Sequence, residues 1–179
     1  MKNYYFLFLS LLLFWGCQKS SVDIESEYQK IKDNQTKFIL NIDNKPFYET
    51  DAIFTGHLEA KNNYFVMNFV NQHGGNYILS LSDDMWFNKK GITGKLYGAA
   101  ISNLMLGKVI DREKNIGAGY LMSEGIIEPI TVSKSKLIFK INGKLKKYPN
   151  VSETDPSFAV NGYIISKNPE YSEYTIPNK

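Results

Sequence analysis

Alternation of apolar and polar residues dominates the chain after residue 37 and predicts β-strands. The segments "FILNI" (38–42) and "YILSLS" (77–82) place apolar side chains at every second position. This period of two is typical of half-buried strands. The segment "NYFVMNFVN" (63–71) is apolar on both faces and predicts a central strand, joined to the next by a tight turn at the paired glycines of "QHGG". The whole pattern predicts an antiparallel meander.

The segment between residues 91 and 133 carries glycines at the edges of its apolar runs. Within it, "AAISNLML" (99–106) predicts a short helix, and the remainder predicts strands that bend or bulge at glycines. Together with the meander, these segments predict a single β-rich domain over residues 37–179. We expect a mainly β fold, an antiparallel β-sandwich or barrel with at most one or two short helices.

Two distant stretches of the chain resemble each other. "KFILNIDNKPFY" (37–48) and "KLIFKINGKLKKY" (136–148) share the phase of their apolar positions, and each contains a turn pair, Asp43-Asn44 in the first and Asn142-Gly143 in the second. Both stretches are therefore predicted to be hairpins. Two explanations remain open, namely related hairpin units or convergence on the residues that a hairpin demands.

The N-terminus has the layout of a secretory signal. Lys2 precedes an uncharged apolar run (4–16), which is shorter than the roughly 20 residues that a membrane-spanning helix needs. The run ends at Gly16 and Cys17, the only cysteine of the chain. This junction resembles the lipobox of bacterial lipoproteins. The resemblance implies that residues 1–16 are a signal peptide and that Cys17 receives the lipid. Residues 17–36 contain almost no large apolar side chains, so we expect them to be a lipidated tether with at most one short helical stretch.

The residues after the cysteine bear on location. Gln18, rather than an aspartate, follows Cys17, which resembles lipoproteins released to the outer membrane. We therefore expect a lipid-anchored outer-membrane protein, on the periplasmic face or at the cell surface. The segments "FKINGKLKKY" and "FAVNGYIIS" are similar to those of small β-rich lipoprotein families of the Bacteroidota, and no catalytic residues come with that resemblance.

Composition and charge narrow the classes of partner. Hydrophobic residues make up 43% and aromatic residues 14% of the chain, which indicates a globular, strand-rich domain. The net charge of +3 falls to about +2 once Lys2 is removed, too little to indicate nucleic-acid binding. The glycine-containing stretches match neither a P-loop nor a dinucleotide fingerprint. Two histidines, His57 and His73, are too few for a typical zinc site, so we expect neither a metal nor a cofactor.

Two clusters carry candidate site chemistry. Asp83, Asp84, Trp86 and Phe87 form the first, because carboxylates beside exposed aromatic rings are typical of sugar-binding sites and of some glycosidases. The alternative is a loop whose aromatic side chains cap the core. The second cluster is a candidate cationic surface for lipid phosphates or an acidic partner, consisting of Lys140, Lys144, Lys146 and Lys147. Its alternative is a solvated outer strand face that discourages edge-to-edge aggregation.

The functional expectation follows from these observations. We expect a non-enzymatic, membrane-anchored component of the cell envelope that binds or assembles with an envelope protein or a glycan. One alternative is a lipocalin-like carrier of a small lipid or sugar ligand, which the aromatic content and the meander favour. The other is an envelope hydrolase that uses Asp83 or Asp84.

Overall fold

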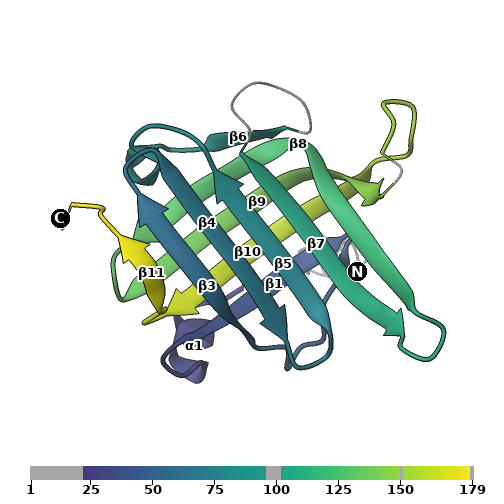
Figure 1. Cartoon of the computed structure of the whole chain (residues 1–179), viewed down its shortest axis with the longest axis horizontal. Coiled ribbons are helices and arrows are strands. Elements are labelled where there is room, and N and C mark those ends of the chain that lie inside the picture. Colours follow the sequence, from purple (N-terminus) through teal and green to yellow (C-terminus); the bar gives the residue numbers. More distant parts are fainter. Residues whose placement is uncertain (1–21, 96–101, 150, 178–179) are drawn as a thin grey trace, which may run out of the picture.

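The computed structural model describes residues 22–95, 102–149 and 151–177, and in it eight antiparallel strands close into a barrel (Figure 1). Each strand pairs with the next along the chain, and β1 pairs with both the last strand and the second, which closes the ring. The barrel strands are β1 (Gln35–Ile42), β3 (Phe54–Lys61), β4 (Tyr64–Asn71), β5 (Gly75–Leu81), β7 (Asn103–Asp111), β8 (Ile116–Val132), β9 (Lys136–Tyr148) and β10 (Phe158–Lys167). The predicted mainly β fold and the predicted meander are confirmed.

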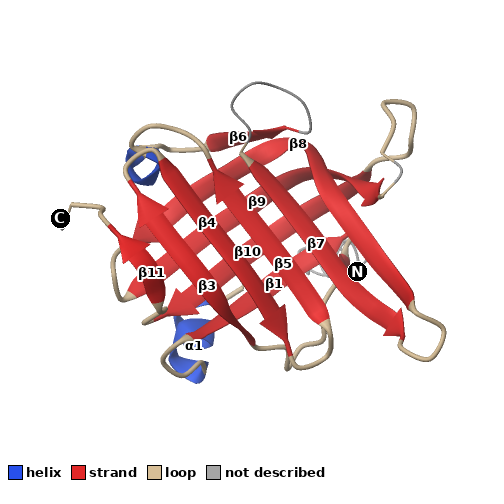
Figure 2. Ribbon diagram, in the orientation of Figure 1, coloured by secondary structure: helices blue, strands red, loops and turns tan. Residues whose placement is uncertain are grey.

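Short elements complete the described fold. These are α1 (Ile24–Lys30), β2 (Lys45–Pro46), the 3₁₀ turn η2 (Trp86–Asn88), β6 (Ile92–Lys95) and β11 (Tyr171–Tyr174). β2 pairs with the last two residues of β1, β6 pairs with β8, and β11 pairs in parallel with β3. Figure 2 shows how small the helical share is beside the strands. In Figure 1, β3, β4, β5 and β7 lie in front and cross over β9, β10 and β1 behind them.

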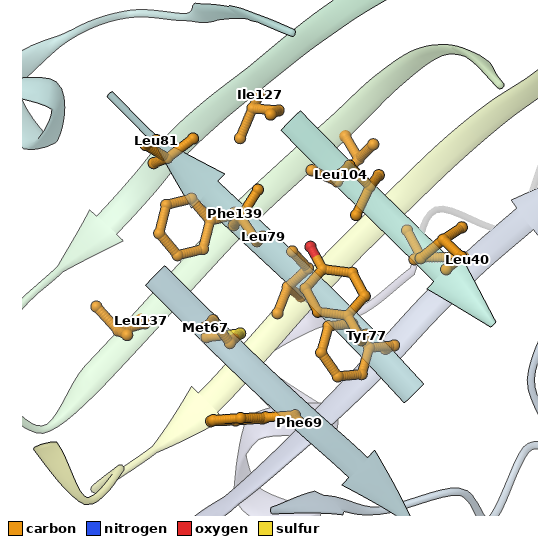
Figure 3. Close-up of a cluster of buried hydrophobic side chains, with 14 of the residues drawn as sticks. Leu40, Met67, Phe69, Tyr77, Leu79, Leu81, Leu104, Ile127, Leu137 and Phe139 are labelled. Carbon is orange, nitrogen blue, oxygen red and sulfur yellow. The ribbon is translucent and has the colours of Figure 1, made fainter. Parts of the chain in front are cut away.

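Side chains fill the space between the front and rear strands. Alternate residues of each strand point inward, as their burial pattern shows for β5 and β9. Figure 3 shows this cluster, in which Met67, Leu79 and Phe139 come from three different strands and are fully buried. The barrel interior is therefore a packed core.

The predicted helix over 99–106 is wrong for its described residues, because residues 103–106 begin β7. Leu104 and Leu106 point into the core and are fully buried, while Met105 between them lies partly exposed. A short apolar run fits a strand and a helix equally well, and here pairing with β5 and β8 decides for the strand. Residues 99–101 lie outside the described residues.

The second predicted hairpin is also wrong, although the first is confirmed. Asp43 and Asn44 form a tight turn between β1 and β2 with φ values of 47° and 63°. Asn142 and Gly143 instead lie inside β9, where Gly143 faces Gly125 of β8. A Cβ on Gly143 would lie 2.4 Å from the backbone oxygen of Glu124, so this glycine lets β8 and β9 approach closely.

The segment expected to be a tether contains a helix that packs on the barrel. Asp23 caps α1 by accepting a hydrogen bond from the Ser26 N–H (3.1 Å). Beyond the helix, Ile31 is buried at 3% exposure against Ile138 and Ile165 on the outer face of the rear strands. The folded unit therefore includes the part of residues 17–36 that the structure describes. No helix among the described residues is long and apolar enough to cross a membrane.

Candidate functional site

One edge of β1 is only partly paired, and this leaves a notch in the barrel wall. β10 covers the other edge of β1 along its whole length, whereas β3 pairs with β1 at a single position, Thr36 with Phe54. At the opposite end of the same edge, Asn41 faces Pro46 of the two-residue strand β2. The edge is open between these two contacts.

Backbone groups that have no partner among the described residues line the open edge. The C=O of Leu40 accepts a hydrogen bond from the Phe47 N–H (2.9 Å), so Leu40 turns its backbone groups away from β10. Because backbone direction alternates along a strand, the N–H and C=O of Phe38 point the same way. No described residue bonds to these two groups or to the Leu40 N–H. Such groups require water or an incoming polar partner.

Contacts to the front strands hold the chain after β2 away from β1. Lys108 of β7 donates from its Nζ to the Phe47 C=O (2.6 Å), and the Tyr48 hydroxyl donates to the Asn76 C=O (2.6 Å). The side chain of Gln72 bonds to the backbone of the same segment at two points (2.9 and 3.1 Å). These hydrogen bonds hold the segment on the far side of the notch. The segment therefore does not pair with β1 beyond Phe47.

A pocket of about 340 Å³ occupies the notch. It lies between the start of α1, the open edge of β1 and the segment after β2. Phe38 and Tyr48 contribute to its lining, although only 4% and 5% of these residues' surface is exposed. The lining residues are Val22, Asp23, Glu27, Lys37, Phe38, Ile39, Leu40, Asn41, Pro46, Tyr48, Glu49 and Thr50.

Carboxylates outnumber cations in this lining. Glu27 accepts from Lys30 (2.6 Å) and from Lys37 (2.7 Å), and these bonds lower the pKa of its carboxyl group. Asp23 is engaged as the cap of α1. The carboxylate of Glu49, on an exposed residue, makes no ion pair with a described residue. The pocket therefore carries a net negative charge, with Glu49 as its uncompensated group.

Comparisons with known proteins return no match, since neither a family model nor a curated protein nor a solved structure matches this chain. The interpretation of the notch therefore depends on its own geometry. Within residues 22–95, 102–149 and 151–177, no group of three or more His, Cys, Asp or Glu side chains could hold a metal ion.

The first predicted cluster does not present its aromatic rings to solvent. Trp86 is fully buried, its Nε1–H donates to the Lys61 C=O (2.8 Å), and its ring centroid lies 4.6 Å from that of Phe65. Phe87 is 8% exposed. This arrangement is the core-capping alternative, and it leaves no exposed ring for a sugar to stack on. Of the two carboxylates, Asp83 binds Lys89 (2.8 Å) and Asp84 is exposed.

The second predicted cluster does not form a continuous cationic surface. Lys140 and Lys144 lie opposite Glu128 and Glu124 of β8, at 3.7 and 2.5 Å. Lys146 is buried at 7% exposure, and its Nζ donates to the C=O groups of Ser152 and Glu153, which ties the following loop to the barrel. Lys147 alone of the four is exposed without an ion pair to a described residue. The solvated-face alternative therefore fits Lys140, Lys144 and Lys147, and Lys146 has a structural contact.

Other predicted positions lie apart from the notch or outside the described residues. His57 is exposed on β3, and His73 lies in the turn after β4, 3.1 Å from Asp51. Cys17 lies outside the described residues.

A polar group that the sequence does not single out lies in the core. Tyr77 is fully buried, and its hydroxyl has no hydrogen-bond partner among the described residues. Figure 3 shows this oxygen among apolar side chains. Burial raises the pKa of Tyr77 well above its usual value, so the hydroxyl stays neutral.

The sequence analysis also missed the notch, although one signal points to it. β2 ends at Pro46 after two residues, and the segment after it does not alternate as a strand does. A strand whose hairpin partner ends so early has an open edge unless another strand covers it. Which strand covers the edge depends on barrel closure, and local sequence does not determine that.

Proposed function

We propose that the protein is a non-enzymatic lipoprotein of the bacterial cell envelope, anchored to the outer membrane at Cys17, whose domain binds a partner through the notch beside β1. The observation that carries the binding part is the open edge of β1, where the backbone groups of Phe38 bond to no described residue and border a pocket of about 340 Å³. The Gly16-Cys17 junction supports the anchor.

The position of α1 gives this proposal a geometric consequence. Val22 lines the pocket, and it follows Cys17 by five positions. A chain reaches at most about 3.6 Å per residue, so a lipid on Cys17 holds Val22 within about 18 Å of the attachment point. The notch would then work close to the membrane surface, on a partner that is presented there.

Metabolic labelling with radioactive palmitate tests the anchor. The wild-type chain and a Ser21→Ala control are expected to carry label and to sediment with membranes. A Cys17→Ala variant is expected to lose the label and to be released, because the thiol is the attachment atom. Label that persists in Cys17→Ala, or a wild-type chain without label, contradicts the anchoring.

A second candidate, a carrier of a small lipid or sugar ligand, is favoured by one observation. The unpartnered Tyr77 hydroxyl would accept or donate a hydrogen bond to a polar group that entered the barrel. Such a ligand would have to displace buried side chains such as Leu79 and Leu104, which fill that space. Native mass spectrometry of the purified domain distinguishes the candidates, because a co-purifying ligand that is lost in Tyr77→Phe supports the carrier.

A further inference from the structure

The notch differs from an ordinary open sheet edge because it is closed at both ends. Thr36 pairs with Phe54 of β3 at one end, and Asn41 pairs with Pro46 of β2 at the other. An added strand that ran the full length of β1 would collide with these two contacts. Only a short extended segment fits between them, opposite residues 37–40.

The unpaired groups specify what such a segment must offer. Phe38 presents one N–H donor and one C=O acceptor on the same side of β1, and Leu40 presents a further N–H. A residue in an extended peptide satisfies both Phe38 groups at once, because paired residues in an antiparallel ladder exchange two hydrogen bonds. Strand addition to an exposed edge is an established mode of peptide recognition.

The charge of the lining specifies which end of a peptide enters. Glu49 supplies a carboxylate without an ion pair to a described residue, and Asp23 adds a second acidic group, whereas Glu27 is paired with Lys30 and Lys37. A free amino terminus is a cation and complements this lining, whereas a carboxyl terminus would be repelled. The volume of the pocket also restricts the bound part to a few residues.

We propose that the notch receives the free amino-terminal end of an extended polypeptide. Its first residues pair with the backbone of Phe38, and its ammonium group contacts the carboxylate of Glu49. The inference rests on the proposed function, since it names the ligand class of the same notch.

Affinity selection with two peptide libraries tests the inference. Both contain pentapeptides randomised at the first three positions, one with free amino termini and one with acetylated amino termini. The purified full-length protein, kept in detergent, is expected to retain members of the free-amino library at least about tenfold more strongly, because acetylation removes the charge that Glu49 complements. A Glu49→Gln variant is expected to lose most of this preference. Glu113→Gln, on the exposed turn after β7, is the matched control and is expected to keep it.

Equal retention of the two libraries overturns the inference, and so does an absence of retained peptides from both. A preference that survives in Glu49→Gln also contradicts it, because the discriminating charge would lie elsewhere. None of these outcomes affects the palmitate labelling. The proposed function could still hold without this ligand. In that case the protein would be labelled at Cys17 and would bind a glycan, and Thr50→Trp, which fills the notch, would abolish the glycan binding.

Discussion

Glu27 of α1 and Lys37 of β1 meet at 2.7 Å across the rim of the notch, and this ion pair fastens the helix to the barrel. Both side chains are about four-fifths buried, with 19% and 20% exposure. Glu27 also accepts from Lys30 within the same helix. The pair therefore holds the start of the folded chain beside the open edge of β1.

Replacement of Glu27 by Gln is expected to destabilise the protein at neutral pH but not in acid. Hydrogen bonds from Lys30, and then from Lys37, lower the pKa of the Glu27 carboxyl group from its usual 4.5. A lowered pKa in the folded state contributes stability above the unfolded value and loses it as the pH falls through the folded value. The free energy of unfolding should fall by about 1 kcal/mol at pH 7 in Glu27→Gln.

Urea titration at pH 7 and at pH 3 measures this difference, with Glu113→Gln as the exposed control. The difference between Glu27→Gln and the wild type should shrink at pH 3. An equal difference at both pH values would mean that the carboxylate charge contributes nothing.

Removal of the Tyr77 hydroxyl is expected to stabilise the protein. An unsatisfied buried polar group costs about 1–3 kcal/mol, so Tyr77→Phe should raise the free energy of unfolding by about 1 kcal/mol. Tyr48→Phe is the matched control and should lower it by a similar amount, because the Tyr48 hydroxyl donates to the Asn76 C=O. Calorimetric melting of the two variants checks the opposite signs. Destabilisation by Tyr77→Phe would indicate a bound partner in the core and would favour the carrier.

Trp86 is expected to behave as a core residue and Asp84 as a surface residue. Trp86→Ala should lower the free energy of unfolding by about 3–5 kcal/mol, because it empties a fully buried site between Phe65 and Phe139. Asp84→Asn should change it by less than about 0.5 kcal/mol. Denaturant unfolding measures both values. A small effect of Trp86→Ala would contradict core capping and revive the sugar-site interpretation.

Lys146 is expected to control the loop that follows β9. Lys146→Met removes the two hydrogen bonds to the C=O groups of Ser152 and Glu153, so the loop should become a site of rapid proteolytic cleavage. Lys144→Met, next to it but exposed and facing Glu124, should leave the cleavage rate unchanged. Limited proteolysis followed by mass spectrometry locates the cut. Equal cleavage of both variants would mean that the lysine does not hold the loop.

Local alternation predicted the strands well wherever one face is buried. The period of two over 77–82 corresponds to β5, and of the paired glycines Gly74 lies in the turn before it while Gly75 begins the strand. The prediction failed where a short pattern is compatible with two structures. The run 103–106 became a strand, and the Asn142-Gly143 pair became a close contact within the barrel, because pairing with distant strands overrode the local preference.

The candidate site could not be predicted in the same way. The notch exists because Lys108 holds Phe47 from 61 positions away and Tyr48 reaches Asn76 over 28 positions. These contacts depend on the closed barrel, and they cannot be predicted from the residue types or from their spacing in the sequence. Burial of Lys146 likewise depends on a loop that folds back over it. The charged and aromatic residues of the sequence therefore indicated candidate site chemistry. The tertiary contacts determined which of these side chains are accessible to a ligand.

Amide hydrogen exchange at Phe38, followed by NMR, tests the central claim most directly. In the free domain the Phe38 N–H faces the notch and bonds to no described residue, whereas the N–H of its neighbour Ile39 faces β10. On addition of a selected peptide with a free amino terminus, exchange at Phe38 is predicted to slow by about tenfold or more, and exchange at Ile39 to stay unchanged. A Phe38 amide that is already protected in the free domain, or that the bound peptide leaves unprotected, would contradict the account.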